Sequence, residues 1–219
     1  MKRFLLLLVV LFLGSLFLCS PVQAVQFDLV GVTDPNNTAH VEFVYNPNLG
    51  IINIDVTNTA AGLDPRITGF AFNKPTAVTG VQSFLGPTGW DYKYDLNNID
   101  TPGQYGLFDL AALTKKDFNG GDANIGIPFL QTYQFEFELA GTNLNTLNEA
   151  SFLGSLSFDA AGPPTENPQY FIARFQRTGA DGEGSDVAIP GTPIPEPSTM
   201  LLLGFGLMGL AAFGRKRFF

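Results

Sequence analysis

The chain has 219 residues, 45% of them hydrophobic, and a formal net charge of −8. This length suits one domain with short flanking segments, and the apolar fraction excludes a disordered chain. Between residues 25 and 195, seven basic residues stand against nineteen acidic ones, a balance of −12 that argues against binding to nucleic acid.

The chain begins with the features of a secretory signal peptide, predicted over residues 1–24. Two basic residues follow the first methionine, residues 4–18 are continuously apolar, and Ala24 stands where a signal peptidase requires a small residue. The apolar run is short for a membrane span, so we expect cleavage between Ala24 and Val25. The single cysteine, Cys19, would leave with this segment, and the mature chain would then hold no disulfide and no thiolate site.

Residues 25–178 read as a series of β-strands. The clearest run is 132–139, where apolar side chains alternate with polar ones as on a half-buried strand. Clusters of Gly, Pro, Asn and Asp separate the runs and are typical of turns. Strands are expected over residues 25–30, 41–45, 52–56, 67–72, 78–84, 90–94, 132–139, 152–158 and 170–175.

Two sheets of four or five strands, packed through their aromatic faces, would account for these runs. The predicted fold is therefore all-β: a single β-sandwich, jelly-roll-like or immunoglobulin-like. Only residues 107–116 favour a short helix. Residues 179–197 are rich in Gly, Asp and Glu and are predicted to be a flexible linker that ends in Pro-Glu-Pro.

Residues 198–219 are predicted to form a transmembrane helix with a basic end. Residues 200–213 are uncharged and apolar, and Arg215, Lys216 and Arg217 follow as a basic stop. With its flanking residues the stretch is at or just below the length needed to cross ~30 Å of hydrocarbon at ~1.5 Å per residue, so the predicted anchor is marginal. The positive-inside rule places the basic end in the cytoplasm and the acidic domain on the other side.

Pro195, Glu196 and Pro197, followed by a short apolar helix and a basic cluster, resemble the PEP-CTERM sorting signal of Gram-negative bacteria. This signal is also catalogued as the ice-binding protein C-terminal domain, and the resemblance covers residues 193–219. It implies recognition by an exosortase, an integral-membrane cysteine transpeptidase-like enzyme, and export in association with exopolysaccharide or biofilm matrix. A plain tail anchor behind a proline-rich linker is the alternative.

The resemblance also implies a route for the chain. The protein is expected to be anchored transiently in the inner membrane by its C-terminal helix, with the domain on the periplasmic side. It would then reach the cell surface or the extracellular matrix, with extracellular polysaccharide as a further candidate partner.

No enzymatic activity, cofactor or metal site is expected. The only histidine, His40, lies in a strand pattern, and the chain has no G-x-S-x-G motif to supply a nucleophile. Glu136 and Glu138 have the i, i+2 spacing of any solvated strand face. Residues 117–124 are rich in oxygen ligands but lack the regular spacing of a calcium loop, so calcium binding stays undecided.

Trp90, Tyr92 and Tyr94 share one face of a predicted strand. Exposed, these rings would stack on sugars, whereas buried they would fill the core, which we favour. Two functions from different classes follow. The preferred one is a non-catalytic surface or extracellular-matrix protein, and the alternative is a carbohydrate-binding or adhesive module that uses these aromatic residues.

Overall fold

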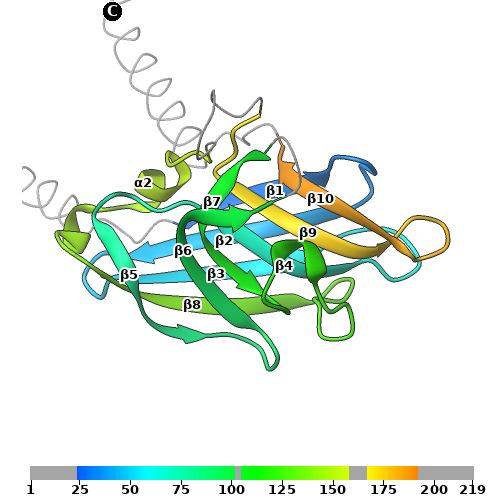
Figure 1. The fold of residues 1–219 in the computed structure, drawn as a ribbon, viewed down its shortest axis with the longest axis horizontal. Helices are drawn as coiled ribbons and strands as arrows, with labels where there is room; N and C mark the ends of the chain where they lie inside the picture. The colour runs from blue at the N-terminus through cyan, green and yellow to red at the C-terminus, as the bar shows by residue number, and fades with distance from the viewer. Residues whose placement is uncertain (1–23, 102–104, 158–166, 192–219) are drawn as a thin grey trace, which may run out of the picture.

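The computed structural model describes residues 24–101, 105–157 and 167–191, in which ten antiparallel strands form one sheet (Figure 1). The strand order across the sheet is β5-β8-β3-β2-β1-β10-β9-β4-β7-β6. The strands are β1 (Val25–Gly31), β2 (Thr38–Asn46), β3 (Ile51–Asn58), β4 (Arg66–Phe72), β5 (Val78–Leu85), β6 (Asp91–Asp100), β7 (Leu107–Leu113), β8 (Thr132–Gly141), β9 (Phe171–Thr178) and β10 (Gly184–Pro190).

Strict alternation of side chains defines the central strands. Every second residue of β2 and β3 is buried, and β8 has the same pattern around Phe135, Phe137 and Leu139. A strand with one face in the core and one in solvent has this period of two. The strands predicted at 41–45, 52–56 and 132–139 are confirmed.

The sheet curls over on itself. Phe70 of β4 lies 4.8 Å from Phe135 of β8 between ring centroids, and Phe72 lies 5.5 Å from Phe137. Five strands separate β4 from β8 in the sheet order, so these rings meet only because the two halves of the sheet face each other. The edge strands β5 and β6 also approach, with the rings of Phe84 and Tyr92 5.6 Å apart.

The predicted all-β class is confirmed, but the two separate sheets of a sandwich are not. Backbone hydrogen bonding continues through all ten strands of the described residues, so one sheet supplies both walls of the aromatic core. Alternation reports which side chains are buried, whereas strand partners depend on contacts distant in the sequence. The predicted packing through aromatic faces does occur, within a single sheet.

The helix predicted over residues 107–116 is wrong, because residues 107–113 form β7. Leu110 and Ala112 belong to the main core, while Ala111 and Leu113 belong to a second apolar cluster that also contains Phe118 and Ile172. A strand buried on both faces loses its alternation and reads as a continuous apolar run. Tertiary burial here outweighs the helix propensity of Leu and Ala.

The strand predicted over residues 152–158 is also wrong, because Phe152 lies in the short helix α2 (Glu149–Leu153). Asn148 Oδ1 accepts a hydrogen bond from Ser151 N at 3.0 Å, and Ser151 Oγ accepts one from Asn148 N at 3.2 Å. This reciprocal capping box starts the helix. Two short 3-10 turns are also present, η2 (Phe118–Gly120) and η3 (Leu144–Thr146).

The flexible linker predicted over residues 179–197 is corrected where the structure describes it. Residues 184–190 form β10, which pairs with β1 on one side and β9 on the other. Two sets of ladder hydrogen bonds and the burial of Val187 and Ala188 hold this strand. Gly191 N still donates to Asp28 O at 2.9 Å, and residues 192–197 lie outside the described part of the chain.

Antiparallel pairing divides the connections between two ends of the sheet. One end holds Ala24, Gly191 and the connections β2–β3, β4–β5, β6–β7 and β8–β9, and we call it the tether end. The other holds the connections β1–β2, β3–β4, β5–β6, β7–β8 and β9–β10, and we call it the distal end. In Figure 1 the tether end carries α2, at the left, and the β9–β10 connection marks the distal end, at the right.

Within residues 24–101, 105–157 and 167–191, no helix is long and apolar enough to cross a membrane. The predicted transmembrane helix at residues 198–219 lies outside these ranges.

Candidate functional site

The three aromatic residues predicted to share one strand face, Trp90, Tyr92 and Tyr94, differ in their exposure. Trp90 is only 7% exposed, and its Nε1 donates to Ile125 O at 2.9 Å. Tyr94 packs against the main core, whereas Tyr92 is 37% exposed beside Phe84 at the edge of the sheet. Trp90 is therefore a core residue, as the favoured interpretation held, and these three rings form no exposed stacking platform.

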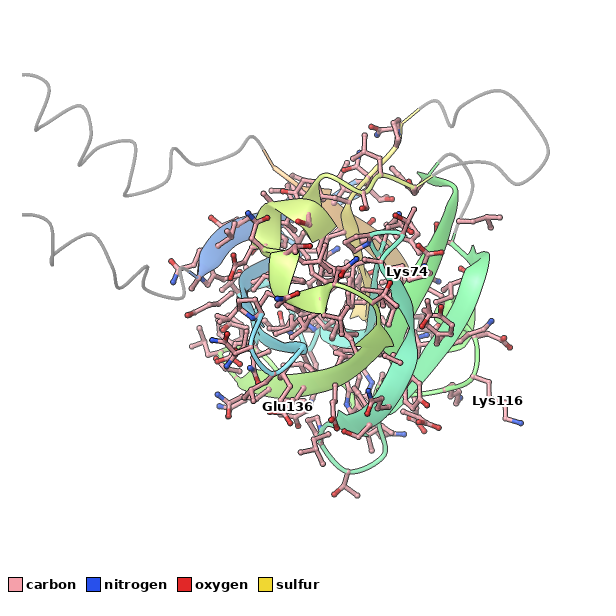
Figure 2. The ribbon with its side chains drawn as sticks, turned by 90° about the vertical axis from the view of Figure 1, so that its left-hand side faces the viewer. Lys74, Lys116 and Glu136 are labelled. Atoms are coloured by element: carbon pink, nitrogen blue, oxygen red, sulfur yellow. The ribbon has the colours of Figure 1, made fainter. Side chains whose placement is uncertain are left out.

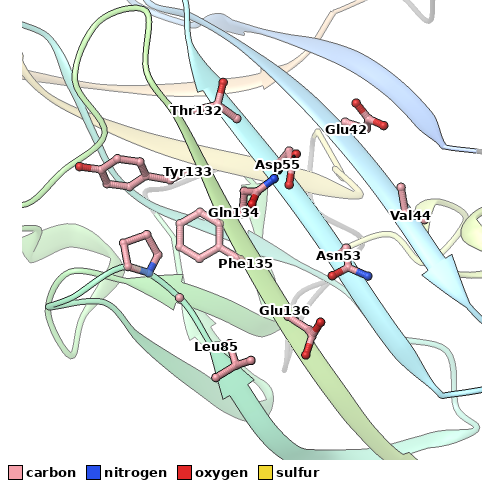
Figure 3. A pocket seen from close by; sticks show the side chains of 12 residues that line it. Glu42, Val44, Asn53, Asp55, Leu85, Thr132, Tyr133, Gln134, Phe135 and Glu136 are labelled. Atoms are coloured by element: carbon pink, nitrogen blue, oxygen red, sulfur yellow. Dashed lines mark hydrogen bonds between the residues drawn. The ribbon is translucent and has the colours of Figure 1, made fainter.

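A polar groove lies instead on the outer face of β2, β3 and β8 (Figure 3). It has a volume of about 690 Å³ and is bounded on one side by the end of β5 and the residues that follow it. Alternate side chains turn away from the core, and those that line the groove from these strands are Glu42, Val44, Asn53, Asp55, Thr132, Gln134 and Glu136. Tyr133 and Phe135 of β8 also line it.

Strand register sets the neighbours within this groove. Glu42 is directly opposite Asp55, and Asn53 is directly opposite Glu136. Two like charges at directly opposed positions destabilise a sheet, so the Glu42–Asp55 pairing carries an energetic cost. Side-chain hydrogen bonds offset part of it, because Gln134 Nε2 donates to Asp55 at 3.0 Å and Gln26 Nε2 donates to Glu42 at 3.3 Å.

Glu136 differs from these carboxylates, since no described side chain donates to it. It faces solvent between Asn53 and Leu85, as Figure 3 shows. Among the described residues that line the groove, none is cationic. The groove thus presents hydrogen-bond acceptors and a net negative charge, which suits a neutral ligand rich in O–H or N–H donors and repels an anionic one.

Metal binding does not follow from these carboxylates. Among the described residues, no group of three or more His, Cys, Asp or Glu side chains is arranged to hold a metal ion. The oxygen-rich segment 117–124 instead contains a local turn, in which Asp122 Oδ1 accepts from Asn124 N at 3.0 Å.

His40 lies on the outer face of β2, beside β1, as the strand pattern predicted. Its Nδ1 is 2.7 Å from Asp28 Oδ1, and the two side chains are 38% and 52% exposed. This pair is a surface contact between neighbouring strands, where Asp28 and His40 are directly opposed.

One carboxylate is buried away from the groove. Asp186 of β10 is 3% exposed and accepts hydrogen bonds from the backbone N–H groups of Thr33, Asp34 and Val187 and from Asn37 Nδ2, at 2.8–3.0 Å. Burial by itself raises the pKa of Asp186, but these four donors stabilise the anion and leave the pKa below its usual value. Asp186 therefore holds the β1–β2 connection against β10.

Positive charge gathers around a smaller depression of about 490 Å³ near the start of β6 and the end of β7. Lys93, Lys115 and Lys116 line it together with Asp91 and Asp117. Figure 2 shows Lys116 and Glu136 projecting from different parts of the surface. The acidic groove and this lysine-lined depression are therefore separate features.

The predicted processing residues lie at or beyond the limits of the described chain. Val25, which would become the first residue after signal cleavage, begins β1 and pairs with Phe43. Cleavage between Ala24 and Val25 would leave this strand complete, and it stays a prediction. The sorting residues Pro195, Glu196 and Pro197 and the basic stop Arg215, Lys216 and Arg217 lie outside the described residues.

The described strands form one β domain that ends at Pro190, and a C-terminal segment follows it in the sequence. A family model described as the PEP-CTERM protein-sorting motif matches residues 193–217 of that segment. The chain therefore carries a PEP-CTERM sorting motif, as its sequence predicted, and the motif implies export, passage through the membrane and processing by an exosortase. No curated protein and no solved structure matches the chain.

Sequence reasoning missed the groove. Of its residues it singled out only Glu136, as one of two glutamates on a solvated strand face. Glu42, Asn53 and Asp55 each carried the available signal, an outward position in an alternating strand. Their convergence depends on β2, β3 and β8 being neighbours, which alternation does not report.

Proposed function

We propose that this chain is a non-catalytic protein of the cell surface or extracellular matrix, delivered by exosortase-dependent sorting and associated with exopolysaccharide or biofilm. The observation that carries this proposal is the PEP-CTERM motif at residues 193–217, which begins three residues after the last strand ends at Pro190. The proposed route runs through an inner-membrane stage with the domain on the periplasmic side.

The position of His40 supports the non-catalytic part of the proposal. His40 is the sole histidine of the chain. Its side chain is hydrogen-bonded to Asp28, an exposed residue of the neighbouring strand. A Ser-His-Asp arrangement needs its histidine within hydrogen-bond reach of a nucleophile. Replacing His40 by Ala should therefore leave folding and any binding nearly unchanged, and a large loss of activity in purified protein would contradict the proposal.

Two sets of tail variants test the sorting route. The variants would be expressed in a Gram-negative host that carries an exosortase. An epitope tag inserted after Asp181, in the exposed β9–β10 connection, would allow the chain to be detected. Glu196→Ala leaves the apolar stretch intact and should leave full-length protein in the membrane fraction. Replacing Arg215, Lys216 and Arg217 by Glu removes the cytoplasmic stop and should release unprocessed chain.

Fractionation and immunoblotting separate these outcomes. Deletion of the exosortase gene should reproduce the Glu196→Ala result with the wild-type chain. Wild-type processing of the Glu196→Ala chain would refute Pro-Glu-Pro as the recognition element. Wild-type processing in the deletion strain would refute exosortase dependence itself.

A second function, binding of neutral polysaccharide, is favoured by the groove on β2, β3 and β8. Its carboxylate and amide groups match sugar hydroxyls, and its negative charge disfavours polymers of uronic acids. The sequence suggested a carbohydrate-binding module that uses the aromatic strand face. Because Trp90 is buried, we place the proposed binding in the polar groove instead.

Glycan binding can be measured with matched variants. Glu136→Ala together with Asn53→Ala should weaken binding to a neutral polysaccharide by about tenfold, the equivalent of about 1.4 kcal/mol. Glu183→Ala, in an exposed connection outside the groove, is the control and should have no effect. Binding of neutral and uronate polymers with equal affinity would refute the proposed use of the groove.

A further inference from the structure

The polar groove and the lysine-lined depression border the same short segment, the β5–β6 connection at the distal end of the sheet. Gly86 and Pro87 of this connection line the groove, and Gly89 lines the depression. Pro87 and Gly89 are two residues apart, so their Cα atoms lie within about 7 Å of each other even where the chain is fully extended. A chain-like ligand that crosses this connection therefore leaves the groove and enters the depression directly.

The β5–β6 connection is held in place by the core. Trp90 N donates to Pro87 O at 3.0 Å, which closes a turn, and Trp90 Nε1 donates to Ile125 O at 2.9 Å. Gly89 has a φ of 87°, and a Cβ at this position would lie 2.7 Å from Ile125 Cδ1. The groove and the depression are therefore kept at a fixed separation.

The three lysines of the depression make no ion pair, although Asp91 and Asp117 also line it. Within the part of the chain that the structure describes, every ion pair is made by His40, Arg66 or Arg177. Three of the seven Lys and Arg residues between positions 25 and 195 thus gather in one depression with their ammonium groups unpaired.

The backbone that carries Lys115 and Lys116 is anchored on both sides. Thr114 precedes them, is buried, and donates from Oγ1 to Thr68 O at 2.9 Å. Phe118 follows them and is buried in the second apolar cluster. Because both ends of this segment are fixed, less conformational freedom is lost when a ligand binds the two lysines.

The depression suits one anionic group on an otherwise neutral molecule. Three ammonium groups against two carboxylates leave a local charge of +1 (3 − 2), which matches one carboxylate. A polymer with a charge on every sugar would be repelled by the acidic groove and by the −12 of residues 25–195 (7 − 19).

Each of the two features also has an apolar surface on which the face of a sugar ring can pack. Leu85 lines the groove and is 64% exposed, and Tyr92 lines the depression and is 37% exposed. Figure 3 shows Leu85 beside Glu136, whose carboxylate can accept hydrogen bonds from sugar hydroxyls.

We propose that the ligand of this surface is a polysaccharide of mainly neutral sugars that carries sparse carboxylate groups. Neutral sugars occupy the groove, the polymer crosses the β5–β6 connection, and a carboxylate enters the depression, where the lysine ammonium groups bind it. This inference rests on the proposed binding of neutral polysaccharide in the groove, and it adds the class of polymer.

Calorimetry with three forms of one glucan tests the proposal on the full chain in a non-ionic detergent. The forms are the neutral glucan, the same glucan lightly carboxymethylated, and the same glucan densely carboxymethylated. At low salt the lightly carboxymethylated form should bind about fivefold more tightly than the neutral one, the equivalent of about 1 kcal/mol. High salt should remove this gain, and the densely carboxymethylated form should bind more weakly than either.

Variants assign the gain to the lysines. Lys115→Gln together with Lys116→Gln should reduce binding of the lightly carboxymethylated glucan to the level of the neutral one and leave neutral binding unchanged. Lys74→Gln, which removes a positive charge in the β4–β5 connection at the tether end, is the control and should change neither. Glu136→Ala together with Asn53→Ala should weaken binding of both forms, because both use the groove.

The stoichiometry tests whether one ligand uses both features. A short oligosaccharide of the same glucan with one carboxymethyl group should bind once per chain. Two bound copies per chain would overturn the crossing of the β5–β6 connection, because the groove and the depression would then act as independent sites.

The outcomes separate this inference from the function on which it rests. Failure of both the neutral and the lightly carboxymethylated glucan to bind would overturn the proposed use of the groove and this inference together. Binding of both with equal affinity would overturn this inference alone. A gain that survives in the Lys115 and Lys116 variant, or tightest binding by the densely carboxymethylated form, would also overturn it, because the carboxylates would then be bound elsewhere or by charge density alone.

Discussion

Replacing Asp186 by Asn should destabilise the domain strongly, although the side chain keeps its shape. The carboxylate is 3% exposed and accepts four hydrogen bonds, two at each oxygen. Asn has one oxygen and one NH₂ group, so whichever way the amide is turned, two of the four donors lose their acceptor.

The cost follows from these contacts. A buried donor left without a partner costs about 1–3 kcal/mol, so two of them should lower the free energy of unfolding by about 3 kcal/mol. This is a large share of the roughly 5–15 kcal/mol that stabilises a typical domain. The β1–β2 connection should loosen first, because Thr33, Asp34 and Asn37 all bind this one carboxylate.

Denaturant unfolding followed by tryptophan fluorescence measures the effect. The chain has one tryptophan, Trp90, and it is buried in the core, so its emission reports global unfolding. The protein for this assay would lack residues 1–24 and 192–219. Asp181→Asn is the control: Asp181 is exposed and accepts one bond, from Glu183 N at 3.2 Å, so the change should stay within about 0.5 kcal/mol.

The pH dependence gives a second check on the same residue. Folding lowers the pKa of Asp186 below its usual 3.8. The ionised carboxylate therefore makes its full contribution to the free energy of unfolding above pH 3.8, and this contribution is lost as the pH falls through the folded-state pKa. The stability difference between the wild type and Asp186→Asn should therefore shrink as the medium is acidified below 3.8. A difference under about 0.5 kcal/mol at neutral pH, or one that is independent of pH, would refute this reasoning.

Three further changes have distinct expected outcomes. Leu130 is 65% exposed and has a φ of 58°, in the left-handed region that favours glycine. Leu130→Gly should therefore raise the free energy of unfolding by about 0.5–1 kcal/mol, and a lower melting temperature would contradict left-handed strain at this position. Glu42→Gln should remove repulsion with Asp55 and stabilise by a few tenths of a kcal/mol at low salt, and a gain that persists in 1 M salt would contradict the electrostatic cause. Phe70→Ala should lower the free energy of unfolding, measured in urea, by about 3–5 kcal/mol, because Phe70 is buried among aromatic rings. Phe129 is half exposed, so Phe129→Ala should lower it far less, and equal losses would contradict the placement of the core.

The strands with one wet face could be predicted from the sequence. Alternation in residues 132–139 follows directly from a backbone whose successive side chains point to opposite faces, and β8 has that pattern. The C-terminal motif could also be predicted, because it is a linear order of prolines, apolar residues and basic residues, and the family model matches it at 193–217.

Elements buried on two sides could not be predicted in this way. Leu107–Leu113 has the composition of a helix, but it is a strand because apolar clusters cover both of its faces. Gly184–Pro190 has the composition expected of a spacer, but it is a strand because β1 and β9 pair with it on either side. The carboxylate of Asp186 also accepts a hydrogen bond from Asp34 N in the β1–β2 connection. In both cases the deciding contacts are supplied by residues far away in the sequence.

By itself, the sequence determined the all-β class, the three alternating central strands and the sorting motif, since each depends on the order of neighbouring residues. Only the tertiary structure decided that one sheet forms both walls of the core, that Glu42, Asn53, Asp55 and Glu136 share a groove, and that β10 reaches almost to the motif. These depend on which strands pair, and pairing is chosen by burial and hydrogen bonding between segments that local periodicity cannot relate.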